Sequence, residues 1–113
     1  MTRHEVVLIP GDGIGPETSA AMQEVVAASG AQIDWIIAKA GAAVIDEFGT
    51  PLPDETIEAI KQYKVAIKGP VTTPVGTGFR SVNVALRKTL NLYTNLRPVM
   101  SIPGAGGRYD DVD

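Results

Sequence analysis

One stretch of the sequence combines residue types that bind carboxylates. Asn83 and Arg87 are four residues apart, so they share one face of a helix predicted from residue 82, and Ser81 is a plausible N-cap. Arg97 follows on a predicted strand (92–99), where alternate side chains point the same way. Because a guanidinium binds a carboxylate through two parallel hydrogen bonds, these groups predict a site for a ligand with several carboxylates. The alternative is an exposed helix face with an unrelated arginine.

A loop with fixed geometry supplies a second set of polar groups. The residues KGPVTTP at 68–74 directly follow the carboxyl end of a predicted strand (65–67), which is where α/β sheets bind ligands. Its prolines would hold Lys68, Thr72 and Thr73 in set positions. Scaffolding without a ligand role is the alternative.

A glycine-rich turn lies near the N-terminus. The residues GDGIGPE at 11–17 stand between a predicted strand and a predicted helix, where glycine permits positive φ and a helix N-terminus attracts anions. Pro16 occupies the position of the third glycine in the dinucleotide fingerprint, and the Gly-Lys-Ser/Thr ending of a P-loop is absent. A tight strand-to-helix turn explains the motif equally well.

The charges are separated along the chain. Residues 1–58 carry ten acids and two bases, whereas residues 59–109 contain no Asp or Glu. This acid-free stretch predicts an anion site, and a polycarboxylate or phosphate suits it better than nucleic acid because the chain is acidic overall and has few aromatic residues. Surface charge paired with acids elsewhere is the alternative. The basic residues of the stretch are Lys61, Lys64, Lys68, Arg80, Arg87, Lys88, Arg97 and Arg108.

Composition excludes several classes of site. The 113 residues, 44% of them hydrophobic, suffice for one domain with a core. Cysteine is absent and His4 is the one histidine, which excludes a disulfide framework, a thiolate nucleophile and a Cys/His zinc cluster within the sequence. A catalytic triad built on His4 is not expected. No apolar run approaches the roughly 18 residues of a membrane helix, and no secretory signal opens the chain, so we expect a cytoplasmic protein that binds neither membrane nor nucleic acid.

The hydrophobic pattern predicts an α/β fold with a mainly parallel sheet, because short continuous apolar runs alternate with helical periodicity. Pro16, Glu17 and Gly30 are typical of the first turn and the end of the first helix. The predicted strands are 6–9, 32–38, 65–67 and 92–99, and the predicted helices are 16–29, 41–48, 54–63 and a segment from 82 to about 90.

Four motifs in order resemble the β-decarboxylating dehydrogenases, the isocitrate and 3-isopropylmalate dehydrogenase family. They are LIPGDGIGPE at 8–17, IKGPVTTPVG at 67–76, SVNVALRK at 81–88 and LYTNLRPV at 92–99. The form Ser-x-Asn-x-x-x-Arg is similar to the isocitrate branch, because the isopropylmalate branch usually has apolar residues where Ser81 and Asn83 stand. The resemblance covers almost the whole chain and implies the N-terminal part of the isopropylmalate dehydrogenase-like fold over residues 1–113.

The resemblance also implies roles for six residues. Ser81, Asn83, Arg87 and Arg97 would hold the carboxylates of isocitrate, Thr72 would touch the nicotinamide side of NAD or NADP, and Lys68 would lie nearby. The implied reaction, a step of the tricarboxylic acid cycle, oxidises a 2-hydroxy acid and releases CO2 with Mg2+ or Mn2+ bound. The complete enzyme would be a homodimer.

The family's catalytic tyrosine and lysine, its metal-binding aspartates and most of its cofactor pocket have no counterpart in these residues. We therefore expect no catalytic or metal-binding residue in this segment, no dehydrogenase activity from the 113 residues alone, and poor stability because sheet surface is exposed. Dehydrogenases of 3-isopropylmalate, homoisocitrate or tartrate, and a non-catalytic regulatory subunit, are the alternatives.

Overall fold

Three parallel strands form one sheet with the order β2-β1-β3. The computed structural model describes residues 2–76, 78–109 and 111–112. The α/β prediction is confirmed, and most predicted boundaries agree to within two residues. The elements are β1 (His4–Ile9), α1 (Gly15–Ala28), β2 (Ile33–Ile37), a short 3-10 helix η1 (Ala42–Val44), α2 (Ile45–Phe48), α3 (Asp54–Tyr63), β3 (Ala66–Lys68) and α4 (Val82–Thr89).

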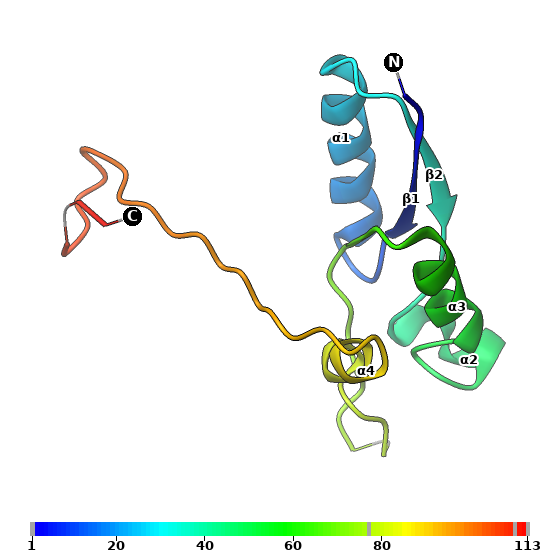
Figure 1. The fold of residues 1–113 in the computed structure, drawn as a ribbon. Helices are drawn as coiled ribbons and strands as arrows, with labels where there is room; N and C mark the ends of the chain where they lie inside the picture. Colours follow the sequence, from blue (N-terminus) through cyan, green and yellow to red (C-terminus); the bar gives the residue numbers. More distant parts are fainter. Residues whose placement is uncertain (1, 77, 110, 113) are drawn as a thin grey trace.

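The central strand β1 carries the core. Leu8 pairs in register with Ile37 of β2 and with Ile67 of β3. Val7 and Ile9 are completely buried and pack in one cluster with Ile57 of α3 and with α4. Since side chains alternate along a strand, Val6 and Leu8 point to the other face of the sheet, beside which α1 runs (Figure 1). Burial on both faces explains why β1 reads as a continuous apolar run.

Helix α1 follows β1 through the glycine-rich turn. Pro16 and Glu17 lie in its first turn, as predicted, and the chain leaves the helix through Gly30 in a left-handed conformation (φ 85°). α1 is 14 residues long, and no helix within the described part of the chain is both long and apolar enough to cross a membrane.

Three glycines, which have no side chain, allow the loops after β1 and β3 to pack against each other. A Cβ on Gly11 would collide with the carbonyl oxygen of Pro70, and a Cβ on Gly15 or Gly69 would collide with the carbonyl oxygen of Pro10. Gly11 also has φ 81°, which other residues rarely adopt. The amide of Asp12 donates to the carbonyl of Pro70 at 2.7 Å. The two loops are therefore packed backbone to backbone at the carboxyl ends of their strands.

The predicted strand at 92–99 is wrong. These residues follow α4 as an extended segment with no strand partner, and residues 91–100 are all exposed, Tyr93 at 97% and Leu96 at 84%. Figure 1 shows this segment leading away from the sheet. The local pattern is that of a strand, but a strand is stable only when another strand pairs with its backbone amides and carbonyls, and none of β1, β2 and β3 pairs with these residues.

Candidate anion-binding site

One pocket of about 340 Å³ lies where β1 and β3 end, between α3 and α4. Ile9 and Lys68 are the last residues of their strands and both line it. Asn83 and Arg87, predicted to bind substrate carboxylates, line this basic pocket together with Lys68, which was predicted to lie near the nicotinamide. Its full lining is Ile9, Ile60, Lys64, Ala66, Lys68, Asn83, Leu86, Arg87, Leu90 and Leu92.

Helix α4 presents the polar groups because its other positions are anchored in the core. Val82 and Leu86 are buried against β1 and α3. Asn83 and Arg87 each follow one of these anchors by one residue, so they share a face turned about 100° from the anchored one. Two anchors four residues apart thus fix which way the amide and the guanidinium face.

The charged groups of the basic pocket are all cations. Lys64, Lys68 and Arg87 contribute them, and no acidic residue is among the described residues that line it. Burial is the main cause that lowers the pKa of Lys68, and the nearby Arg87 guanidinium lowers it further. Nζ of Lys68 donates to the carbonyl of Gly69 at 2.8 Å. Two cations that raise each other's free energy form a site that an anion would stabilise.

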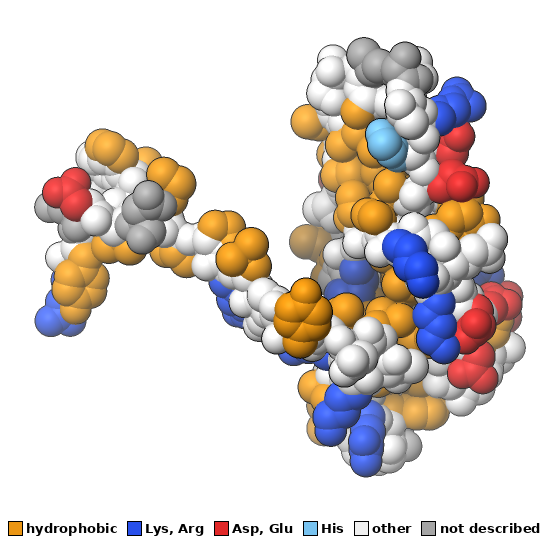
Figure 2. Space-filling model, in the orientation of Figure 1, with side chains coloured by type: hydrophobic (Ala, Val, Ile, Leu, Met, Phe, Trp, Pro, Cys, Tyr) orange, Lys and Arg blue, Asp and Glu red, His pale blue; other side chains and the backbone are white. Residues whose placement is uncertain are grey.

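The cations of residues 59–109 are mostly without carboxylate partners. Within the described ranges, Lys61 is the one that forms an ion pair, with Glu58 at 2.9 Å. Figure 2 shows basic side chains over α3 and α4, whereas acidic side chains lie along the side of β2 and α2. The separation of charge along the sequence is only partly a separation in space, because α3 carries Asp54, Glu55 and Glu58 as well as Lys61.

Ser81 stands directly before α4, but it does not cap the helix with its side chain. Instead, the amide of Val82 donates to Oγ1 of Thr73 at 3.1 Å. Ser81 is exposed and does not line the basic pocket. The predicted position of the N-cap is confirmed, but the Ser81 side chain caps no amide of the helix, and Thr73 instead accepts the first amide of α4, which an N-cap side chain does not serve.

Thr72 lies in the loop after β3, and its amide donates to Oδ2 of Asp12 at 2.7 Å. Oδ2 of Asp12 also accepts from Ala42 at 2.9 Å, and Oδ1 accepts from Ala43 at 3.0 Å. Burial raises the pKa of Asp12, but the three amide hydrogen bonds outweigh it, so the pKa lies below its ordinary value. Thr72 itself has an exposed side chain, outside the basic pocket.

Arg97 is not brought to the pocket. It lies on the exposed segment after α4, and its Nε donates to Oδ1 of Asn95 at 3.4 Å. The predicted convergence of Arg97 with Arg87 depends on a strand that is not formed.

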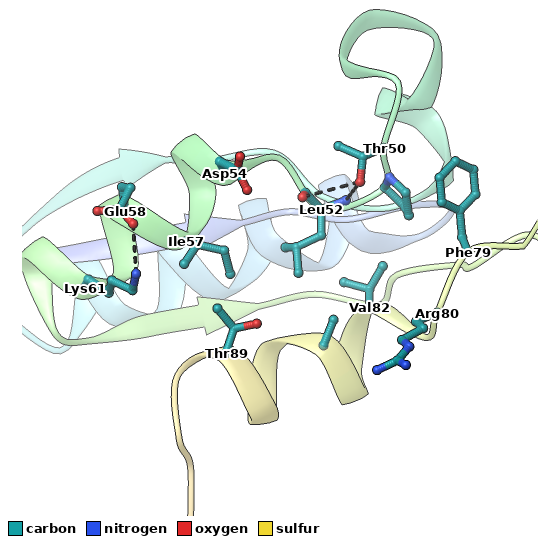
Figure 3. A pocket seen from close by; sticks show the side chains of 12 residues that line it. Thr50, Leu52, Asp54, Ile57, Glu58, Lys61, Phe79, Arg80, Val82 and Thr89 are labelled. Carbon is teal, nitrogen blue, oxygen red and sulfur yellow. Dashed lines mark hydrogen bonds and ion pairs between the residues drawn. The ribbon is translucent and has the colours of Figure 1, made fainter.

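A larger cleft of about 500 Å³ lies on a neighbouring face of α4, where Val82 contributes to its floor (Figure 3). Its rim carries acids and bases together, with Glu58 and Lys61 already paired. Since its charges are mixed, this α3–α4 cleft lacks the preference for anions that the smaller basic pocket has.

Comparison with known proteins decides the family. A family model described as isocitrate/isopropylmalate dehydrogenase matches residues 5–109. The chain belongs to the isocitrate/isopropylmalate dehydrogenase family. The crystal structure of isocitrate dehydrogenase from Methylococcus capsulatus is similar to it with a TM-score of 0.87 and 50% identity, over 96% of this chain and 32% of that one.

Two curated relatives within the family are 47% identical to this chain. One is a mitochondrial regulatory subunit of NAD isocitrate dehydrogenase from Dictyostelium discoideum, matched over 96% of this chain and 29% of the relative. The other is the NADP isocitrate dehydrogenase of Haloferax volcanii, matched over 88% of this chain and 25% of the relative. The chain thus spans less than a third of these family members.

The described residues of this family member do not make up a metal site. They bring together no group of three or more His, Cys, Asp or Glu side chains that could hold a metal ion. The carboxylate that converges with other groups, Asp12, already accepts three amide hydrogen bonds. A divalent cation therefore does not fit these described residues by themselves.

Sequence reasoning missed Asp12 and Thr73 as organising residues and Lys64 as a pocket residue. Asp12 stands between two glycines in a strand-to-helix turn, where an acid is expected to bond its own backbone, so the sequence holds no signal for its bonds to residues 30 to 60 positions away. Lys64 follows the end of α3 in a left-handed conformation (φ 68°), which brings it to the pocket and which its residue type does not indicate.

Proposed function

We propose that this chain supplies the carboxylate-binding wall of an NAD- or NADP-dependent isocitrate dehydrogenase. The observation that carries the proposal is the basic pocket, in which Lys68, Asn83 and Arg87 converge without an acidic neighbour among the described lining residues. Family membership supports a dehydrogenase, and relatives named for both NAD and NADP support a nicotinamide cofactor of either kind.

In this proposal the described residues bind and orient the substrate. Arg87 donates two parallel hydrogen bonds to one carboxylate, and Asn83 on the same helix face donates its amide to a different carboxylate, the one that 3-isopropylmalate lacks. Lys68 at the end of β3 holds a further carboxylate as a point charge. Fixed in this way, the C–H bond of the substrate's carbinol carbon is held towards the nicotinamide, which lowers the entropic cost of hydride transfer.

The proposed reaction has two steps. Hydride passes from the 2-hydroxy acid to the nicotinamide, and the resulting 2-oxo acid loses its β-carboxylate as CO2 to give 2-oxoglutarate. The proton-transfer groups and the ligands of Mg2+ or Mn2+ would lie outside these 113 residues. Ser81, Arg97 and Thr72 are included in the proposed site by resemblance, with Arg97 reaching it once a partner strand orders residues 92–99.

Asn83 favours isocitrate over 3-isopropylmalate. The amide lines the basic pocket and can bind a third carboxylate, whereas the isopropyl group would leave it without a partner. Apolar neighbours such as Leu86 and Leu90 keep 3-isopropylmalate as a competing substrate, and homoisocitrate and tartrate remain alternatives within the family.

A regulatory role is the second candidate function. The chain is 47% identical to a relative named as a regulatory subunit, and it is equally identical to a relative named for the dehydrogenase itself. Such a subunit would bind isocitrate through the same cations without turning it over.

Activity of the full-length protein that carries this chain tests the proposal. Nicotinamide reduction is followed with isocitrate and Mg2+, with NAD and NADP tested separately, and 3-isopropylmalate serves as the competing substrate. We expect turnover of isocitrate by the full-length protein and none by the 113-residue chain. Calorimetric binding of isocitrate without turnover would favour the regulatory role, and absence of both binding and turnover would refute the proposal.

A further inference from the structure

The Asp12 carboxylate joins three loops that are far apart in the sequence. It accepts the amides of Ala42 and Ala43, after β2, and the amide of Thr72, after β3, at 2.7–3.0 Å, while its own residue belongs to the loop after β1. Each loop follows the carboxyl end of one strand of the sheet. One side chain thus sets the spacing of all three loops at the edge where the basic pocket opens.

The surroundings are shaped to this carboxylate. A Cβ on Gly41 would collide with the Asp12 carboxylate, and Gly41 has φ 112°, a conformation that other residues rarely adopt. The amide of Asp12 is also held by Pro70 at 2.7 Å. Both the main chain and the side chain of Asp12 are therefore fixed to the loop that carries Thr72.

A second hydrogen bond continues this link to helix α4. Thr73 follows Thr72, and its Oγ1 accepts the amide of Val82, the first residue of α4, at 3.1 Å. Val82 is buried, so its amide depends on this protein partner. The path from Asp12 to α4 therefore consists of two hydrogen bonds and one residue of chain.

We propose that Asp12 is a positioning residue for the anion-binding face of α4. Asp12 binds the amide of Thr72 and so fixes the position of Thr73. Thr73 in turn binds the first amide of α4 and so fixes where Asn83 and Arg87 lie in the basic pocket. Asp12 acts through other residues and does not itself contact the anion. The kinetic test of this inference rests on the proposed function, whereas its hydrogen-exchange test rests on the structure alone.

Asp12→Asn in the full-length protein tests this role. The amide group keeps the size of the side chain but turns one acceptor oxygen into a donor that faces backbone amides. We expect kcat/KM for isocitrate to fall by up to about 100-fold, the order expected when a bound group is displaced by about 1 Å, with most of the change in KM for isocitrate. Glu24→Gln, an exposed acid on α1, is the matched control and should leave kinetics unchanged.

Hydrogen exchange measured by mass spectrometry gives a readout independent of activity. In Asp12→Asn, peptides that cover residues 40–44 and 70–76 should exchange faster, whereas β1 and α1 should not. Thr73→Val removes only the second link, so it should raise KM for isocitrate and leave the exchange of residues 40–44 unchanged. If Asp12 and Thr73 act along one path, the effect of the double variant on KM should be smaller than the sum of the two single effects.

These outcomes separate the inference from the proposed function. Lower thermal stability in Asp12→Asn with unchanged KM would overturn the positioning role, and so would additive effects of the two variants. If the wild type turns over no isocitrate, the proposed function fails, and unchanged exchange of residues 70–76 in Asp12→Asn would still overturn the inference by itself.

Discussion

Arg87 is the residue whose replacement tests the basic pocket most directly. In Arg87→Gln the side chain keeps much of its length and its polarity but loses the charge and the forked pair of donors. Two effects should follow in the full-length protein. Isocitrate should bind more weakly, and the pKa of Lys68 should rise towards its ordinary value because the repulsion from Arg87 is gone while burial remains.

The size of the binding effect follows from the exposure of the site. A charge-assisted hydrogen bond contributes about 1.5–3 kcal/mol, and Arg87 can offer two to one carboxylate. Since Arg87 is exposed at the pocket, solvent screens part of this, and we expect a loss of about 1.4–3 kcal/mol in binding free energy. At about 1.4 kcal/mol for each factor of ten, the KM for isocitrate should rise about 10- to 150-fold.

Lys88→Gln is the matched control, because Lys88 is the next residue of α4, is exposed and does not line the basic pocket. The assay compares KM for isocitrate and follows lysine side chains by 13C NMR titration. An equal rise of KM in both variants would show that only the general charge of this surface attracts the substrate. A rise of less than about threefold in Arg87→Gln, or an unchanged Lys68 titration, would refute the geometry described for the pocket.

Three further predictions concern other parts of the chain. Ser81→Asp should keep the fold, since Asp is a good N-cap, but abolish isocitrate turnover by placing a negative charge beside the substrate, and retained activity would remove Ser81 from the site. Ile57→Ala should lower the free energy of unfolding by about 2–4 kcal/mol in urea titrations, because the Ile57 side chain is buried, at 6% exposure. The control variant Val25→Ala, at 71% exposure, should change this free energy by less than about 0.5 kcal/mol. Because the pKa of Asp12 is lowered in the folded state, its carboxylate stabilises the fold above the ordinary pKa of 3.8, and this stabilisation is lost as the pH falls through the folded-state pKa. Asp12→Asn should therefore reduce the fall in the free energy of unfolding at acidic pH, measured by urea titration. An unchanged fall would contradict the three hydrogen bonds to Asp12.

Local pattern predicted the regular elements well where their partners lie nearby in the sequence. The apolar run of β1 indicates a strand buried on both faces, and Pro16 and Glu17 indicate the first turn of α1, and the structure agrees with both. The same reasoning failed for residues 92–99. Their alternation is typical of a strand, but local pattern does not reveal whether another strand is available to accept the hydrogen bonds.

The candidate site divides in the same way. Asn83 and Arg87 were predicted together because four residues along a helix is a local spacing, and the structure places both in the basic pocket with Lys68. Thr73 as the acceptor of the first amide of α4 was missed, because it lies nine residues before Val82, beyond the reach of local pattern.

The sequence by itself determined the types of chemistry and the family. Its four ordered motifs indicate the β-decarboxylating dehydrogenases, its acid-free stretch predicts an anion site, and its absence of cysteine excludes thiolate and disulfide chemistry within these residues, because residue type and short-range spacing are enough for such inferences. Only the tertiary structure decided that Lys64, Lys68 and Arg87 share one pocket, that Arg97 stands apart from it, and that Asp12 joins three loops. These facts depend on which strands lie side by side and how closely their loops pack, and such distances arise between residues that are tens of positions apart in the chain.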